Sequence, residues 1–114
     1  MKYYHNYGSS TYNDGIPEHI RDSFERYLMH GLEPGGFVTA VLANDLFLAV
    51  SRADAINVTK IPHIALWVYH NMPAGSIGSY DIVRDWIKDV DNIRTNYSEK
   101  KKKELFYEVM ENPN

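Results

Sequence analysis

Hydrophobic residues recur at helical spacing along most of this chain, and the pattern predicts an all-α protein. The first predicted helix begins at Pro17 and ends near Gly31, a residue type suited to the C-terminus of a helix. Its apolar positions follow the i, i+4, i+7, i+8 spacing of an amphipathic helix, and they are Ile20, Phe24, Tyr27 and Leu28.

The second predicted helix, 36–51, is the most apolar segment of the chain. Its hydrophobic positions extend around much of the helix circumference, and they are Phe37, Val38, Val41, Leu42, Leu46, Phe47 and Val50. This distribution predicts a buried central helix that ends between Ser51 and Asp54. Asn44 and Asp45 are a polar pair that interrupts the apolar run about two turns after the helix begins.

A third helix is predicted from Thr59, a candidate N-cap, to Pro73, with Pro62 in its first turn. Within it, the continuous apolar run 64–69 also fits a short β-strand. The helical stripe through this run and the preceding proline favour a helix, although so short a run fits both periods.

Two further helices complete the predicted set. A loop over 73–78 leads to Ser79, which is the candidate N-cap of a fourth helix that carries apolar residues as far as Val90. The last helix is predicted over 98–111. The segment 16–114 is therefore expected to form a single small all-α domain of four to five helices.

An extended, tyrosine-rich arm is predicted over 1–15, ahead of the helical domain. It carries four tyrosines among Asn, Ser and Gly and shows neither a helical nor a strand period. Two interpretations are open: a flexible arm, or an arm whose tyrosines dock on the domain or on a neighbouring subunit.

Composition narrows the function classes. The chain has 114 residues, a formal net charge of −3 and no cysteine, which excludes disulfides and thiolate chemistry. The acidic balance makes a nucleic-acid partner unexpected, because the basic run from Lys100 to Lys103 has no other basic patch to support it. No apolar run approaches the roughly 20 residues of a membrane span. We expect a cytoplasmic protein without a membrane partner.

Nine tyrosines and two tryptophans are many for a chain of this length. Such side chains serve interfaces well, and a small domain has little interior in which to bury them. The composition therefore predicts a homo-oligomer, with a symmetric dimer as the simplest case and the 1–15 arm as a contributor.

The segment Pro34-Gly35-Gly36-Phe37 is the strongest candidate for a binding site. Two glycines at a helix start leave backbone N–H groups uncovered, and the positive end of the helix dipole attracts anions such as phosphate. Further candidate ligand-binding residues are Arg26 and Arg52 for charge, Asn44, Asp45 and Asn57 for polar contacts, and Tyr27 and Phe37 for stacking. The structural alternative is that Asn44 and Asp45 cap or bridge helices, with Arg52 or Asn57 as partner.

Catalytic and metal-binding motifs are not found. Five histidines are present, but no HExxH motif or other convincing ligand spacing accompanies them, and no GxSxG motif occurs. The sequence predicts neither a catalytic residue nor a metal or cofactor, and a non-enzymatic protein is favoured.

The segment from Ile16 to about Trp86 resembles a group of short, mostly uncharacterised proteins of phages and prophages. The motifs that carry the resemblance are Ile16-Pro17, Arg21 with Arg26-Tyr27, His30-Gly31, Pro34-Gly35-Gly36-Phe37, Ala40-Val41-Leu42, Asn44-Asp45-Leu46, Arg52-Ala53-Asp54, Asn57, Gly78-Ser79 and Trp86. The resemblance implies a phage protein acting in the host cytoplasm. Small phage proteins without catalytic motifs often counteract host defence by binding.

We therefore expect a counter-defence protein that sequesters a nucleotide-like immune signal. The alternative is a protein–protein inhibitor or adaptor that acts on a host or phage protein, with the tyrosine-rich arm and exposed aromatic side chains as its main contacts.

Overall fold

The computed structural model describes the backbone of residues 16–111 and the side chains of 16–107. This part of the chain consists of helices and loops without a β-strand, which confirms the all-α prediction. The predicted arm over 1–15 lies outside the described residues. The helices are α1 (Glu18–His30), α2 (Gly36–Leu42), α3 (Leu46–Arg52), α4 (Asn57–Asn71), α5 (Tyr80–Lys88) and α6 (Ile93–Glu111), with short 3-10 helices η3 (Ala74–Ser76) and η4 (Val90–Asn92).

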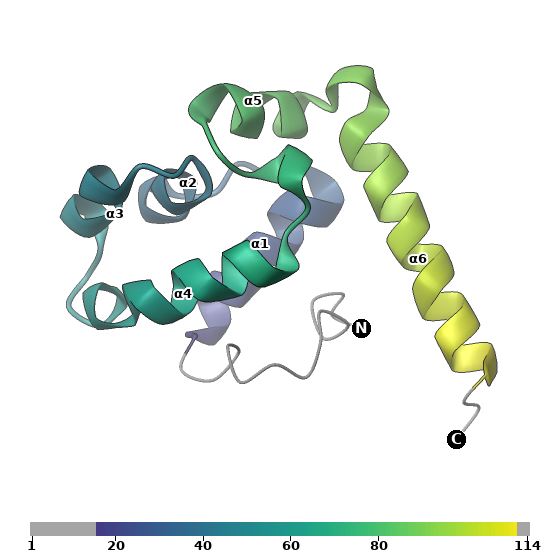
Figure 1. The fold of residues 1–114 in the computed structure, drawn as a ribbon, viewed down its shortest axis with the longest axis horizontal. Helices are drawn as coiled ribbons and strands as arrows, with labels where there is room; N and C mark the ends of the chain where they lie inside the picture. The colour runs from purple at the N-terminus through teal and green to yellow at the C-terminus, as the bar shows by residue number, and fades with distance from the viewer. Residues whose placement is uncertain (1–15, 112–114) are drawn as a thin grey trace.

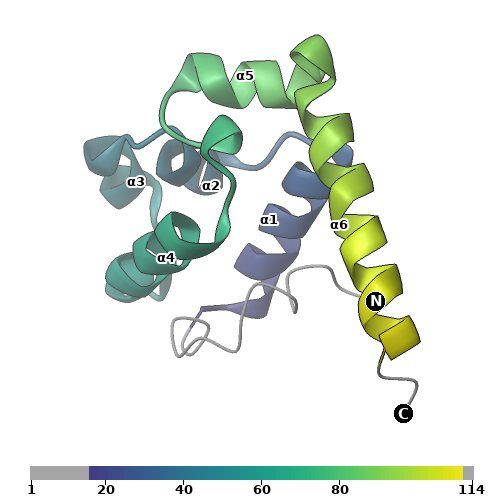
Figure 2. The ribbon, with the colours of Figure 1, turned by 45° about the vertical axis from the view of Figure 1, so that its right-hand side comes forward.

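The helices surround a core that is centred on α1 (Figures 1 and 2). Helix α5 crosses one end of the molecule, α2 and α3 lie at one side, and the long α6 runs down the other side along α1. Phe24 stacks on Trp67 of α4 at 5.3 Å between ring centroids. Trp86 of α5 packs against Tyr27, and its indole N–H donates to the Tyr27 carbonyl at 3.1 Å. Aromatic side chains from three helices therefore form the centre of the core.

Gly31 ends α1 as the sequence predicted. Its φ of +65° is the left-handed conformation, and its N–H donates to the Tyr27 carbonyl at 3.0 Å. The N–H of the next residue, Leu32, donates to the Arg26 carbonyl at 3.3 Å. The guanidinium of Arg94 lies directly over this glycine, where an added Cβ would come within 2.6 Å of Arg94 Cζ. Arg94 also donates to the carbonyl of Trp86 at 3.1 Å. One side chain at the start of α6 thus joins the ends of α1 and α5.

The prediction of one continuous helix over 36–51 is wrong, because the chain turns at Asn44. Asn44 adopts a φ of +60°, which asparagine tolerates better than most residues, and α2 ends at Leu42. Asp45 then caps α3, accepting from Leu48 N at 3.2 Å. The expected burial also fails for α3, in which Ala49 alone is buried and Phe47 is 87% exposed.

Helix α4 begins before the predicted cap. The Asp54 carboxylate accepts from Asn57 N at 2.6 Å and from Ile56 N at 3.0 Å, and so takes the capping role that was assigned to Thr59. Pro62 consequently lies inside the helix and not in its first turn. The apolar run 64–69 is helical, as its stripe indicated.

Ser79 caps α5 as predicted, with its hydroxyl accepting from Ile82 N at 3.1 Å. The last helix begins at Ile93, earlier than the predicted 98, because Asp89 provides a cap across the intervening turn. The Asp89 carboxylate accepts from Arg94 N at 2.9 Å, from Thr95 N at 3.0 Å and from the Thr95 hydroxyl. These bonds lower the pKa of Asp89, and the bond from the Thr95 hydroxyl has the largest effect. The described part therefore holds six α-helices, more than the four or five expected.

Candidate functional site

The junction between α2 and α5 positions a polar link and a cavity at the surface. Gly78 donates its N–H to the Leu42 carbonyl at 2.8 Å, which fixes the start of α5 against the end of α2. Its φ of +128° is a conformation that other residues rarely adopt, so a glycine is required at this contact. The next residues along the chain, Ser79 and Tyr80, are thereby placed beside Asp45.

Asp45 and Tyr80 form the polar link at this junction. The Tyr80 hydroxyl donates to Asp45 Oδ2 at 2.6 Å, while Asp45 Oδ1 caps α3. The hydrogen bond from Tyr80, and next the bond from Leu48 N, lower the pKa of Asp45; the same Tyr80–Asp45 bond raises the pKa of Tyr80. Asp45 therefore both caps and bridges helices, as the structural alternative expected, but its partner is Tyr80 and not Arg52 or Asn57.

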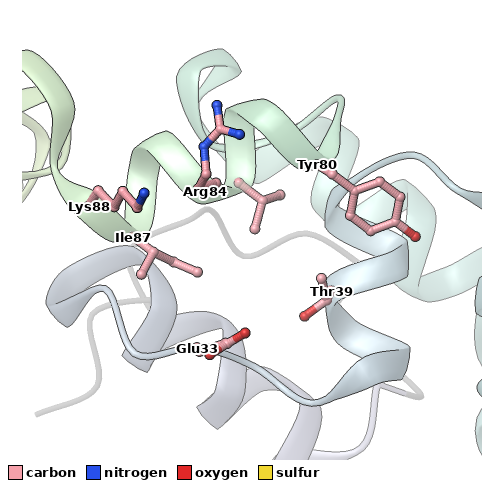
Figure 3. A pocket seen from close by; sticks show the side chains of 7 residues that line it. Glu33, Thr39, Tyr80, Arg84, Ile87 and Lys88 are labelled. Carbon is pink, nitrogen blue, oxygen red and sulfur yellow. The ribbon is translucent and has the colours of Figure 1, made fainter.

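A cavity of about 320 Å³ lies between α5 and the chain segment that contains the start of α2. Figure 3 shows Tyr80, Arg84, Ile87 and Lys88 on the α5 side, with Glu33 and Thr39 on the opposite side. The residues that line it are Glu33, Thr39, Tyr80, Val83, Arg84, Ile87 and Lys88. We call this cavity the α2–α5 pocket.

The α2–α5 pocket combines an apolar interior with charges of both signs. Val83 and Ile87 supply aliphatic surface, and Tyr80 supplies an aromatic ring. Arg84 is held by Asp81 at 3.1 Å and by Asp85 at 3.3 Å, in exposed ion pairs of small energetic value.

Lys88 and Glu33 are the other two charged residues of the pocket. Neither side chain forms a hydrogen bond or an ion pair with the residues that the structure describes. The pocket can therefore offer a cation, a carboxylate acceptor and an apolar surface to the same small molecule.

A shallower hollow of about 460 Å³ lies on the other side of Tyr80. Its lining residues are Ala43, Asn44, Asp45, Leu46, Phe47, Ser79 and Tyr80. Tyr80 lines both hollows, so it belongs to the α2–α5 pocket and to the hollow beside α3. The hydrogen bond to Asp45 fixes the position of the Tyr80 ring.

Of the predicted site residues, Gly36 and Arg52 are brought together. A Cβ added to Gly36 would lie 2.7 Å from Arg52 Nη1, so the guanidinium occupies the space that the missing side chain leaves. Gly35 has open space beside it. Neither glycine nor Arg52 lines the α2–α5 pocket, and α2 has only seven residues.

Three other predicted residues lie in the interior. Tyr27 is fully buried and donates its hydroxyl to the Ser76 carbonyl at 2.6 Å, and burial raises its pKa. Phe37 is 8% exposed and belongs to the core, and Asn57 is 5% exposed in the first turn of α4. The rings of Tyr27 and Phe37 therefore contribute to packing and have little surface for a ligand.

Arg26 and Asn44 are two further predicted residues, and both are exposed. Arg26 lies on the surface of α1, and Asn44 lies in the hollow beside Asp45. The nine predicted residues are thus spread over the molecule, and only Asn44 and Asp45 border a hollow next to the α2–α5 pocket.

The pocket residues that sequence reasoning missed are Glu33, Thr39, Tyr80, Arg84 and Lys88. One signal was available, because Tyr80, Arg84, Ile87 and Lys88 follow the spacing of a single helix face. Glu33 and Thr39 carry no such signal, because only tertiary packing brings them opposite α5.

No cluster of three or more His, Cys, Asp or Glu residues suited to a metal ion occurs among the described residues. Within the same part of the chain, every helix is too short or too polar to cross a bilayer. Comparisons with protein-family models, with curated proteins and with solved structures found no match. The candidate function therefore depends on the geometry of the site itself.

Proposed function

We propose that the protein binds a small, nucleotide-like anion in the α2–α5 pocket and releases it chemically unchanged. The observation that supports the proposal most is the position of Lys88. It has no hydrogen-bond or ion-pair partner among the described residues, and it lines a cavity together with aromatic and aliphatic side chains. The cavity volume of about 320 Å³ lies at the lower end of the range for small-molecule sites.

Each part of such a ligand has a complementary group in the pocket. Lys88 would attract a phosphate group, whereas the Arg84 guanidinium points away from the cavity in Figure 3 and pairs with Asp81 and Asp85. Tyr80 and Ile87 offer apolar surface to a base, and the Glu33 carboxylate can accept a hydrogen bond from a ribose hydroxyl or a base amino group. Glu33 also disfavours a ligand that carries only negative charge, so the pocket suits an anion with donor groups at its other end.

The proposed biological role combines this pocket with the resemblance to phage proteins. A protein that holds a nucleotide signal without degrading it lowers the free concentration of that signal in the host cell. We therefore propose a counter-defence role, in which the ligand is a nucleotide messenger of host immunity.

Isothermal titration calorimetry tests the binding step, with ADP-ribose, cyclic AMP and cyclic di-AMP as probes. Lys88→Gln is expected to weaken binding at least tenfold, since losing a charge-assisted hydrogen bond costs about 1.5–3 kcal/mol. Lys103→Gln, at an exposed position on α6, is the matched control and should bind as the wild type does. The bound probe, released by heat, should keep its mass.

Two outcomes would contradict the proposal. If no probe of the panel binds, the protein is not a trap for this class of ligand. If Lys88→Gln and Lys103→Gln weaken binding equally, the effect is one of overall charge and the pocket is not the site.

A second candidate function is a protein–protein inhibitor or adaptor, and an aromatic pair near the end of α6 favours it. Phe106 and Tyr107 are each 61% exposed and pack edge to face at 5.9 Å between ring centroids. Exposed aromatic residues are frequent hot spots of interfaces. Capture of one stoichiometric protein from infected cells, lost in the variant Phe106→Ala/Tyr107→Ala, would favour this function over ligand binding.

A further inference from the structure

Helix α3 exposes an apolar side. Phe47 is 87% exposed, Leu46 is 59% exposed and Val50 is 46% exposed, whereas Ala49 on the other side is buried. Exposed single apolar residues are normal on protein surfaces, but three within one short helix are not scattered. This side of α3 has no covering element among the described residues.

Helix α4 exposes a second apolar stripe. Positions 58, 62, 65 and 69 follow the spacing of one helix face, and they carry Val58, Pro62, Ala65 and Tyr69. All four are exposed, and Tyr69 reaches 77%. Leu66, at the border of the same stripe, is 43% exposed. The buried side of α4 is formed by different residues, among them Ile64 and Trp67.

A narrow groove lies where α2, α3 and α4 meet. It has a volume of about 80 Å³, and its lining residues are Ala40, Val41, Asn44, Asp45, Leu46, Ala49, Ile61 and Ala65. Leu46 of the exposed side of α3 and Ala65 of the α4 stripe thus border the same groove. We call the exposed apolar side chains of the two helices together the α3–α4 face.

Charged residues are few in the segments that build the α3–α4 face. Among Asp, Glu, Lys and Arg, only Arg52 occurs over 46–52 and only Lys60 over 58–69. Interface cores are depleted of charged residues and enriched in aromatic ones relative to the rest of the surface. Homodimer interfaces are also more apolar than those of transient complexes. The chemistry of this face thus fits a permanent, apolar partner.

The size of the face can be compared with the need of a stable dimer. Phe47 and Tyr69 together leave roughly 300 Å² of aromatic side chain in contact with water. The half-exposed aliphatic side chains raise this to on the order of 500 Å², near the upper end for a monomer surface. Together with a polar rim, the face approaches the area that a standard interface buries on each partner, which is about 800 Å².

We infer that the α3–α4 face is the contact surface of a symmetric homodimer. In a two-fold arrangement each copy uses the same surface, so Phe47 of each copy lies near the α3–α4 face of the other. The hollow beside Phe47 offers space for a ring from the second copy, and apolar side chains line it together with Asn44, Asp45 and Ser79. Tyr80 lines both this hollow and the α2–α5 pocket. The dimer contact is tested independently of the ligand proposal, because neither Lys88 nor Glu33 belongs to the face.

Sedimentation equilibrium of the full-length chain tests this inference at micromolar concentration. The wild type is expected at twice the chain mass of 13.2 kDa. Phe47→Glu and, independently, Tyr69→Glu should raise the dissociation constant by about 100-fold or more, since symmetry introduces each charge twice. Leu32→Glu is the control, because Leu32 is an exposed apolar residue that lies outside the face.

Each outcome decides for or against the dimer. Monomeric Phe47→Glu and Tyr69→Glu variants with wild-type circular dichroism, beside a dimeric Leu32→Glu variant, support the inference. A monomeric wild type overturns it, and the face would then have another occupant. Dimers that survive both substitutions, or that only Leu32→Glu dissociates, also overturn it, because the contact would lie elsewhere.

Discussion

The substitution Tyr27→Phe tests the most buried polar link of the fold. The Tyr27 hydroxyl donates to the Ser76 carbonyl at 2.6 Å, and both residues are fully buried. The bond joins α1 to η3, which is the segment that leads into α5. Replacement by phenylalanine keeps the ring and its packing on Trp86, so the measured change reports the hydrogen bond.

The expected loss is about 1–2 kcal/mol at pH 7, because the Ser76 carbonyl stays buried without its donor. For a domain of this size, a loss of 1 kcal/mol lowers the melting temperature by roughly 4–8 °C. The stability difference between the two chains should also depend on pH in the alkaline range. Burial raises the pKa of Tyr27, so its contribution to stability is complete below the unfolded pKa of about 10 and declines as the pH rises above that value.

The assay is urea unfolding of both chains, followed by circular dichroism, between pH 7 and pH 11. The wild-type advantage should shrink by about 1.4 kcal/mol per pH unit above pH 10 and be nearly gone at pH 11. Equal stability of the two chains at pH 7 would refute the reasoning on the hydrogen bond. A difference that stays constant up to pH 11 would refute the reasoning on burial of the phenol.

Two further substitutions test helix caps. Ser79→Ala should lower the free energy of unfolding by about 1 kcal/mol, because Ile82 N loses its acceptor at the start of α5, and an unchanged urea midpoint would contradict this role. At acidic pH, the free energy of unfolding of Asp89→Asn should fall less steeply than that of the wild type. The pKa of Asp89 is lowered in the folded state, so its stabilisation is complete above the unfolded pKa of about 3.9 and is lost as the pH falls through the lower folded value. Unfolding curves that fall equally for both chains below pH 4 would contradict the Asp89 cap.

The sequence predicted helix ends correctly where the apolar periodicity and a capping residue agreed. Gly31 and Ser79 are examples, because the left-handed end of α1 and the N-cap of α5 follow from residue type alone. Periodicity misled at 36–51, since the apolar pattern continues across Asn44 while the backbone turns there. The capping side chain of Asp45, and not the hydrophobic pattern, determines where α3 begins.

The candidate site was harder to predict than the fold, for a physical reason. The anion-binding interpretation of Gly35 and Gly36 stays a prediction: Gly35 has open space beside it, and the Arg52 guanidinium lies over Gly36. The α2–α5 pocket instead depends on a contact between segments that are distant in sequence, fixed by the bond from Gly78 to Leu42. No local pattern encodes that contact.

The most direct test of the proposed function is an amide NMR titration of the full-length protein with ADP-ribose and with cyclic di-AMP. The account predicts that at least one probe shifts the signals of Thr39, Val83 and Ile87, around the α2–α5 pocket, and that these shifts are lost in Lys88→Gln. Shifts confined to α6, or no shift with either probe at millimolar concentration, would contradict it.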